Sequence, residues 1–313
     1  MKLVIQIPCL NEEATLPLVL KSIPENIEGI DEITILVIDD GSTDKTVAIA
    51  KKHGVREFVS HPQNMGLARS FQDGIAKALE LGADIVVNTD GDNQYPQQEI
   101  PNLIKPLIEG QADIAIADRQ TATIEHFSGF KKFLQKLGSD TVNWAAGTNL
   151  PDAASGFRAY SRASLMRLNT TTRFSYAMET IIQAGNKGMS IASVPITTNP
   201  KTRESRLFKS TFEHVRKSGA AIARAYIMYR PYVIFASLGI LLLIAGLIPF
   251  VRYLILLLQD HTTPHLQSLI LGTVLLTGSF MCFVLGIVAD LTRTNRILLE
   301  DTLEHVKELR FKK

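Results

Sequence analysis

The sequence contains few of the residues on which several common classes of protein depend. Its 313 residues include only two cysteines, Cys9 and Cys282. Because Cys282 lies in a long apolar stretch, we expect no disulfide between them. The formal net charge is only +2, which does not favour nucleic acid as a partner. No Gly-x-Gly-x-x-Gly follows an apolar run, and this argues against a Rossmann dinucleotide site.

Charged residues are also missing from two long stretches near the carboxyl end. Residues 232–258 contain one charged side chain, Arg252, and residues 266–289 contain none. Each stretch reaches the roughly 20 residues that a helix needs to cross the hydrocarbon core of a bilayer. Residues 259–265 carry no lysine or arginine, whereas basic residues flank both outer ends of the pair. This pattern predicts a hairpin of two membrane spans whose ends both face the cytoplasm.

The amino-terminal half consists of short apolar runs that alternate with patterns typical of helices. The runs at residues 3–8, 33–38 and 83–87 have the apolar, β-branched character of buried parallel strands. Such alternation predicts an α/β fold with a mainly parallel sheet flanked by helices. The chain starts at a predicted strand without a signal-like segment, so we expect this half to remain in the cytoplasm.

Acidic and amide residues follow the predicted strands directly. The segment Asn88-Thr89-Asp90-Gly91-Asp92-Asn93-Gln94 places Asp90, Asp92 and Gln94 at alternate positions. Mg²⁺ is typically held by one or two carboxylates and by the phosphates of a substrate, although Asp-Gly-Asp also occurs in solvated turns. A second cluster, Asp39-Asp40-Gly41-Ser42-Thr43-Asp44, follows another strand. Since ligands of open α/β sheets bind at the carboxyl ends of the strands, the two clusters together predict a nucleotide-diphosphate site.

These patterns divide the chain into four parts. Residues 1–210 are expected to form a cytoplasmic globular domain, and residues 231–290 two transmembrane helices at about 232–258 and 266–289. Residues 211–230 have an apolar stripe with basic residues elsewhere, typical of a helix in the membrane surface. Packing on the globular domain is the alternative. Residues 291–313 predict a cytoplasmic helix whose apolar spacing also suits a homo-oligomer.

Taken together, these motifs resemble the family 2 glycosyltransferases of the GT-A fold. Three further segments are similar to the dolichyl-phosphate mannose synthase branch: Asp152-Ala153-Ala154-Ser155-Gly156-Phe157-Arg158, Val194-Pro195-Ile196 and Arg203-Glu204-Ser205-Arg206-Leu207. The resemblance implies a nucleotide-diphospho-sugar transferase sheet and Mg²⁺ or Mn²⁺ as cofactor. It further implies inverting transfer of one sugar from a UDP- or GDP-sugar to a polyprenyl or dolichyl phosphate at the cytoplasmic face of the cell membrane.

The resemblance also implies roles for individual residues. Those expected to hold the donor nucleotide are Pro8, Leu10, Asn11, Glu12, Asp39, Asp40 and Asp90, and those expected to hold the metal are Asp90, Asp92 and Gln94. The acceptor phosphate would meet Arg119, Lys131 and Arg203, with Lys132 as an alternative to Lys131. The residues expected to carry the reaction are Asp92, Asp152 and Arg206.

Other interpretations of these residues and of the whole chain stay open. Asp152 also suits a loop N-cap or an ion pair with Arg158, and Arg203 and Arg206 also suit a solvated basic patch. The nearest alternative function is transfer to a glycolipid or polysaccharide. The chain contains no Gln-x-x-Arg-Trp and only two predicted spans, too few to build a polymer channel. The other alternative is a non-catalytic scaffold that binds nucleotide sugars, against which the intact set at positions 90, 92 and 94 argues.

Overall fold

The computed structural model describes residues 1–120, 129–169, 176–200, 231–258 and 266–312, with the backbone alone for residues 129–135. The helix expected at residues 211–230 lies outside these ranges. The chain forms two compact units, one made of Met1–Ala223 with Leu303–Lys313 and the other of Arg224–Thr302.

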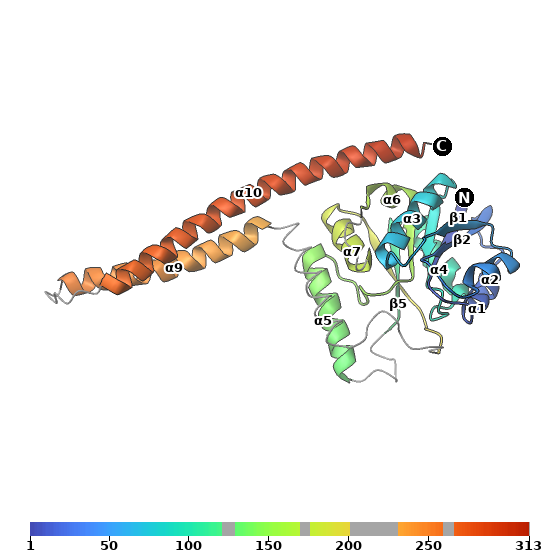
Figure 1. The fold of residues 1–313 in the computed structure, drawn as a ribbon, viewed down its shortest axis with the longest axis horizontal. Coiled ribbons are helices and arrows are strands. Elements are labelled where there is room, and N and C mark those ends of the chain that lie inside the picture. Colours follow the sequence, from blue (N-terminus) through green and yellow to red (C-terminus); the bar gives the residue numbers. More distant parts are fainter. Residues whose placement is uncertain (121–128, 170–175, 201–230, 259–265, 313) are drawn as a thin grey trace. The chain divides into compact units, whose positions relative to one another are not determined.

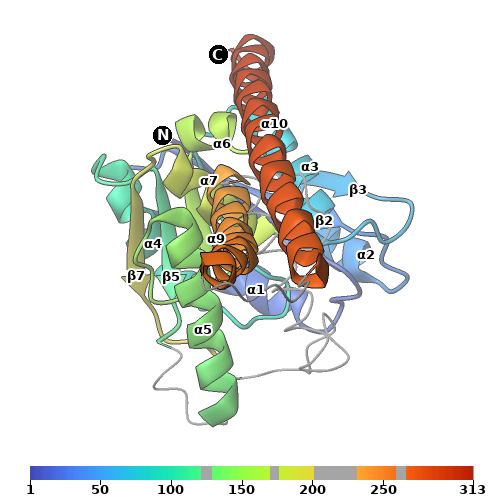
Figure 2. The same cartoon turned by 90° about the vertical axis from the view of Figure 1, so that its left-hand side faces the viewer.

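The larger unit is built on a seven-stranded sheet with the strand order β3-β2-β1-β4-β6-β5-β7. Figure 1 labels three of these strands, β1, β2 and β5. β3 and β7 form its two edges, on opposite sides of Figure 2. The strands are β1 (Lys2–Cys9), β2 (Glu32–Asp39), β3 (Glu57–Ser60), β4 (Ile85–Asn88), β5 (Ile114–Asp118), β6 (Arg158–Ser161) and β7 (Ile191–Pro195). All pairings are parallel except those that β6 makes with β4 and β5. The prediction of a mainly parallel α/β sheet is therefore confirmed.

Helices connect and cover these strands. Those of the larger unit are α1 (Leu16–Ser22), α2 (Thr46–Lys52), α3 (Leu67–Glu80), the short 3₁₀ helix η1 (Gln97–Glu99), α4 (Ile100–Ile108), α5 (Gly129–Ala146), α6 (Arg162–Arg167) and α7 (Tyr176–Asn186). Leu3, Ile5 and Ile7 of β1 are fully buried in an apolar cluster with residues of α1 and α4. α3 packs closely on β1 and β2. Its contact surface includes Gly74, and the lack of a side chain there permits the close approach, since a Cβ would lie only 2.6 Å from Gln6 Oε1.

The second unit is a hairpin formed by α9 (Pro231–Leu258) and most of α10 (Leu266–Arg310), two helices that are each long and apolar enough to cross a membrane (Figure 1). Small residues line their contact: Ser279 Oγ donates a hydrogen bond of 2.7 Å to the carbonyl of Gly239. A Cβ at Gly272 would lie 2.7 Å from the ring of Phe250. Close approach at small residues is how helices associate in lipid, whereas most of the large apolar side chains of both helices are exposed.

α10 is one uninterrupted helix that contains both the span expected at about residues 266–289 and most of the helix expected at residues 291–313. It continues to Arg310. No glycine or proline occurs between residues 287 and 310, so nothing in the local sequence ends the helix there.

The carboxyl-terminal end of α10 belongs to the larger unit and is fastened to α6. Lys307 Nζ donates to the carbonyl of Leu168 at 2.8 Å, to Asn169 Oδ1 at 2.7 Å and to the carbonyl of Met166 at 3.3 Å. These groups lie at and just beyond the end of α6, where helix carbonyls lack partners within the helix. Arg162 donates to the carbonyl of Phe311, whose side chain is buried.

We expect Lys307→Met to lower the free energy of unfolding by about 1–3 kcal/mol, because it removes the donor shared by three buried or half-buried acceptors. The measurement is the thermal denaturation midpoint of the full chain in detergent. Lys312→Met is the matched control, since Lys312 is exposed and the same charge is lost. Equal midpoints for the two variants would contradict a stabilising role for Lys307.

Candidate active site

The ends of four parallel strands and the start of the antiparallel strand meet at one edge of the sheet. The amide of Asp40 donates to the carbonyl of Cys9 at 2.9 Å, and the amide of His61 to that of Asp39 at 2.9 Å. Asn88, the last residue of β4, pairs with Arg158, the first residue of β6. The segments after β1, β2, β3 and β4 therefore lie beside the loop of residues 152–157, and the expected gathering of acidic segments at one edge is confirmed.

The segment after β1 is tied to the segment after β2. Asn11 has a positive φ of 56°, its amide donates to Ser42 Oγ at 2.9 Å, and its Oδ1 accepts from the amide of Thr43 at 2.8 Å. Thr15 Oγ1 lies 2.8 Å from both Glu12 Oε2 and the carbonyl of Gly91. Pro8, Leu10, Asn11 and Glu12, which were expected at the donor nucleotide, thus line the same edge as the Asp90 segment.

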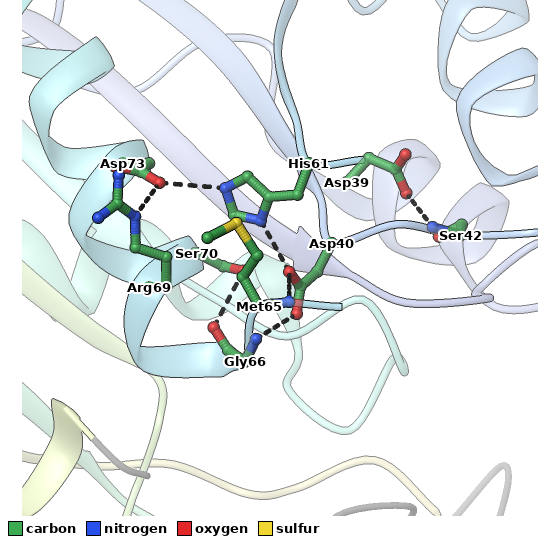
Figure 3. A network of polar contacts seen from close by, with 9 residues as sticks. All are labelled: Asp39, Asp40, Ser42, His61, Met65, Gly66, Arg69, Ser70 and Asp73. Carbon is green, nitrogen blue, oxygen red and sulfur yellow. Dashed lines mark hydrogen bonds and ion pairs between the residues drawn. The ribbon is translucent and has the colours of Figure 1, made fainter. Parts of the chain in front are cut away.

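Asp40 is held by three donors from the protein itself (Figure 3). Its carboxylate accepts from the amides of Met65 at 2.8 Å and Gly66 at 2.9 Å. His61 Nδ1 lies 2.7 Å from Asp40 Oδ1. Asp40 is buried, and these contacts fasten the loop of residues 61–66 to the end of β2. The expected contact of Asp40 with the donor stays a prediction. The carboxylate of the neighbouring Asp39 points instead toward Ser42 and accepts a hydrogen bond of 3.0 Å from its amide (Figure 3).

The sequence analysis missed His61 and its second partner. His61 Nε2 lies 3.1 Å from Asp73 Oδ2, which Arg69 Nε also contacts at 2.6 Å (Figure 3). A histidine directly after a strand was a signal in the sequence, but its place beside Asp40 follows from the parallel pairing of β3 with β2, which only the structure shows. What hid the signal was the short, half-buried sequence of β3, Glu-Phe-Val-Ser, which lacks the long apolar run of the other strands.

The three residues expected to hold a metal directly follow β4. The amide of Gln94 donates to Asp92 Oδ1 at 3.0 Å, which forms a tight turn around Asn93 at φ 62°. Gly156 leaves space beside Asp90, since a Cβ there would lie 3.2 Å from Asp90 Oδ2. Two carboxylates and an amide oxygen are hard ligands that suit Mg²⁺ or Mn²⁺ and leave coordination positions for phosphate oxygens. The residues therefore fit a divalent cation.

Arg119 and Asp152 form a bidentate ion pair. Arg119 Nε lies 2.6 Å from Asp152 Oδ2, and Nη2 lies 2.9 Å from Oδ1. Burial disfavours the charged guanidinium, but the oxygen of Tyr95 and the carboxylate of Asp152 together raise the pKa of Arg119 above its ordinary value. Asp152 was expected at the reaction and Arg119 at the acceptor phosphate. The structure joins the two.

Arg158 is not the partner of Asp152. Its guanidinium is fully buried and donates to the carbonyls of Ser155, Ala177 and Ala153 at 2.7, 2.7 and 2.9 Å, and to Thr180 Oγ1 at 3.0 Å. It therefore braces the loop of residues 152–157 from inside and connects it to α7. That role follows from its position as the first residue of β6, which lies between β4 and β5 in the interior of the sheet.

Two buried groups near Asp90, Cys9 and Tyr95, stay protonated near neutral pH. Burial raises the pKa of the Cys9 thiol well above its ordinary value, and the nearby carboxylates of Glu12, Asp39 and Asp90 raise it further. Burial also raises the pKa of Tyr95, against the opposing effect of Arg119. A neutral thiol is a poor nucleophile, which argues against a covalent step through Cys9.

The remaining expected residues lie outside the described part of the structure. Arg203 and Arg206 fall in the segment 201–230, and Lys131 and Lys132 lie on α5 among residues whose side chains are not described. Their roles at the acceptor phosphate and in the reaction stay predictions.

Residues 4–168 match the family described as glycosyl transferase family 2. The chain belongs to this family. One similar relative is the UDP-N-acetylglucosamine–dolichyl-phosphate N-acetylglucosaminyltransferase of Methanococcus voltae, 29% identical over 217 residues, which cover 61% of this chain and 83% of the relative. Another is the polyprenol monophosphomannose synthase of Mycolicibacterium smegmatis, 27% identical over 228 residues, which cover 69% of this chain and 84% of that protein.

The fold of this family 2 member is also similar to solved structures. One is glucosyl-3-phosphoglycerate synthase from Mycobacterium tuberculosis in complex with Mn²⁺, UDP-glucose and phosphoglyceric acid, with a TM-score of 0.56 and 22% identity, covering 72% of this chain and 78% of that one. At this identity the likeness shows the fold, and it confirms the GT-A sheet.

We expect Asp40→Asn to loosen the loop of residues 61–66. The side-chain nitrogen of asparagine would face one of the N–H groups whose hydrogen bonds the carboxylate accepts. The loss of such a buried hydrogen bond costs about 1–3 kcal/mol, measured as a lower thermal midpoint. Binding of both UDP and GDP should weaken with it. Asp140→Asn on the exposed side of α5 is the control. If Asp40→Asn lost nucleotide binding while its thermal midpoint stayed unchanged, Asp40 would instead contact the donor directly.

Proposed function

We propose that this chain transfers one sugar from a nucleotide-diphosphate sugar to a polyprenyl or dolichyl phosphate at the membrane surface, with inversion at the anomeric carbon. The observation that carries the proposal is the presence, in one family 2 chain, of an oxygen-ligand site at the edge of the GT-A sheet and of two helices apolar enough to cross a membrane. Relatives with dolichyl-phosphate and polyprenol in their names support a lipid phosphate as acceptor.

The acceptor needs little activation by the protein. A phosphate monoester has its second pKa near 6 and is largely dianionic at neutral pH, so its oxygen can attack the anomeric carbon without a general base. The bond from that carbon to the donor diphosphate breaks, and the nucleoside diphosphate leaves with the electron pair. Positioning and charge compensation are then the main tasks of the site.

Arg119 is suited to hold the attacking phosphate. A guanidinium has five N–H donors, of which Asp152 takes two. The remaining three lie on the planar fork that matches phosphate oxygens. Asp152 then acts through Arg119: it orients the guanidinium and keeps it charged in a buried setting. Arg203, Arg206 and Lys131 are proposed as further phosphate ligands.

Asp90, Asp92 and Gln94 would hold the donor through a divalent cation. When bound, Mg²⁺ or Mn²⁺ neutralises the charge that grows on the leaving diphosphate. UDP- and GDP-sugars are both candidates for the donor.

The function is tested by incubating membranes that contain the chain with labelled UDP-glucose, UDP-N-acetylglucosamine or GDP-mannose and with polyprenyl phosphate. We expect one donor to give an organic-soluble, sugar-labelled lipid, and unphosphorylated polyprenol to give none. Label in a glycolipid or polysaccharide fraction would identify another acceptor. Donor binding without turnover on any acceptor would identify a scaffold. Either result would overturn the proposal.

We expect Asp92→Ala to reduce transfer by about 10²–10³-fold, because it removes a carboxylate that holds the ion which stabilises the leaving diphosphate. Asp92 lies in a loop after β4, so the thermal midpoint should change little. Asp140→Ala is the control for loss of a carboxylate. Turnover near that of the wild type in the presence of EDTA would refute the metal site.

The proposed topology places the catalytic unit and both chain ends in the cytoplasm. In a background without Cys9 and Cys282, a single cysteine at Thr262 should react with an impermeant maleimide added outside cells, whereas one at Thr302 should not. The expectation follows from residues 259–265, which contain no lysine or arginine. Labelling of both positions from the same side would indicate a surface-bound hairpin.

A further inference from the structure

Both backbone polar groups of Gly156 form hydrogen bonds with residues that flank the proposed metal ligands Asp90, Asp92 and Gln94 in the sequence. The N–H of Gly156 donates to the hydroxyl oxygen of Tyr95 at 3.0 Å. Its carbonyl accepts from Asn88 Nδ2 at 3.0 Å and from the hydroxyl of Tyr176 at 3.4 Å. Asn88 lies two residues before Asp90, and Tyr95 directly follows Gln94. Both backbone polar groups of one residue are thus bound by the two ends of the segment 88–95.

Asn88 can make these contacts in one orientation only. It is fully buried at the end of β4. Gln6 Nε2 donates to Asn88 Oδ1 at 2.9 Å, and Asn88 Nδ2 donates to the hydroxyl of Tyr176 at 2.7 Å. With its acceptor and both donor directions in use, the amide cannot flip without losing buried hydrogen bonds, which is costly in a low-dielectric interior.

Tyr95 is equally constrained. It is only 2% exposed, and its ring stacks on that of Phe157 with centroids 5.2 Å apart. Phe157 directly follows Gly156, so the ring and the hydroxyl of Tyr95 contact consecutive residues of one loop. This double contact fixes the loop against the segment that carries Asp90, Asp92 and Gln94.

The geometry at Gly156 connects this grip to the carboxylate of Asp90. A Cβ at position 156 would lie 3.2 Å from Asp90 Oδ2 and 3.5 Å from the Tyr95 hydroxyl. The same loop carries Asp152, which holds Arg119. A shift of Gly156 would therefore disturb the ligand Asp90 on one side and the Arg119–Asp152 pair on the other.

We propose that Tyr95 and Asn88 are positioning residues that clamp the backbone N–H and C=O of Gly156, and that this clamp sets the spacing between the proposed metal ligand Asp90 and the proposed phosphate-binding Arg119–Asp152 pair. The inference rests on the proposed function and deepens it. The clamp couples the half of the site that holds the donor diphosphate to the half that receives the acceptor phosphate.

The test compares Tyr95→Phe with Tyr160→Phe. Both tyrosines are buried in the same unit, but the Tyr160 hydroxyl has no hydrogen-bond partner within the described part of the structure. Two quantities are measured on the full chain in detergent: the Mn²⁺ concentration that gives half-maximal transfer, and Mn²⁺ affinity in the presence of UDP or GDP by electron paramagnetic resonance. The second needs no turnover.

We expect Tyr95→Phe to weaken Mn²⁺ affinity and to lower kcat, each by about 5- to 150-fold, the range for losing one partner of a buried hydrogen bond. Tyr160→Phe should stay within about twofold of the wild type. Gly156→Ala should have a larger effect than Tyr95→Phe on Mn²⁺ affinity, because its methyl group would contact the Asp90 carboxylate.

Several outcomes would overturn the clamp. Wild-type Mn²⁺ affinity and kcat in Tyr95→Phe would show that the hydroxyl positions nothing, and a lower thermal midpoint with unchanged Mn²⁺ affinity would show a merely structural role. Wild-type protein that binds Mn²⁺ with nucleotide but transfers no sugar would refute the proposed function, while the resonance titration would still decide the clamp. Absence of Mn²⁺ binding by the wild type would refute both.

Discussion

The arrangement of the site depends on the two different pairings of β4. β4 runs parallel to β1 and antiparallel to β6. Its carboxyl end consequently meets the carboxyl ends of β1 and β2 on one side and the amino end of β6 on the other. The acidic segments come from the first set of neighbours, and the loop of residues 152–157 comes from the second. An all-parallel sheet would have sent that loop to the opposite edge, away from Asp90.

Buried polar groups hold this edge together, and each is stable only because its partners are present. Asp40 takes three donors, Arg158 four acceptors, and Arg119 a bidentate carboxylate. Removing one partner from such a group strands a desolvated charge, at a cost of several kcal/mol. Networks of this kind add little to net stability, but they restrict the loops to one arrangement. A site that works by positioning charges needs that restriction more than it needs additional reactive groups.

The helical hairpin meets a different physical requirement. In lipid the hydrophobic effect does not hold two apolar helices together, so contact depends on close packing and on polar groups that find a partner. Gly239, Gly272 and Ser279 supply both, through notches that admit large side chains and through one interhelical hydrogen bond. An enzyme that acts on a lipid phosphate benefits from such an anchor, because it confines the search for the acceptor to the membrane surface.

Much of the architecture could be predicted from short-range patterns. Apolar runs of strand length, helices between them and two charge-poor stretches of membrane length were enough to predict the mainly parallel sheet and the apolar hairpin, because periodicity and length act within a few residues of one another. The proposed metal ligands Asp90, Asp92 and Gln94 could be named for the same reason, since they lie within five residues of one another.

Partners that are distant in the chain could not be predicted in this way. Arg119 and Asp152 are 33 residues apart, and either had plausible alternatives. Only the antiparallel entry of β6 brings them together. His61 joins Asp40 because β3 lies beside β2, and Tyr95 joins Gly156 across 61 residues. The amino-acid sequence by itself determined which strands, helices and ligand types this protein has. The tertiary structure decided which charged side chains pair with each other and which are left to meet a ligand. The reason is that the order and register of the strands set the distances between residues that are far apart in the chain.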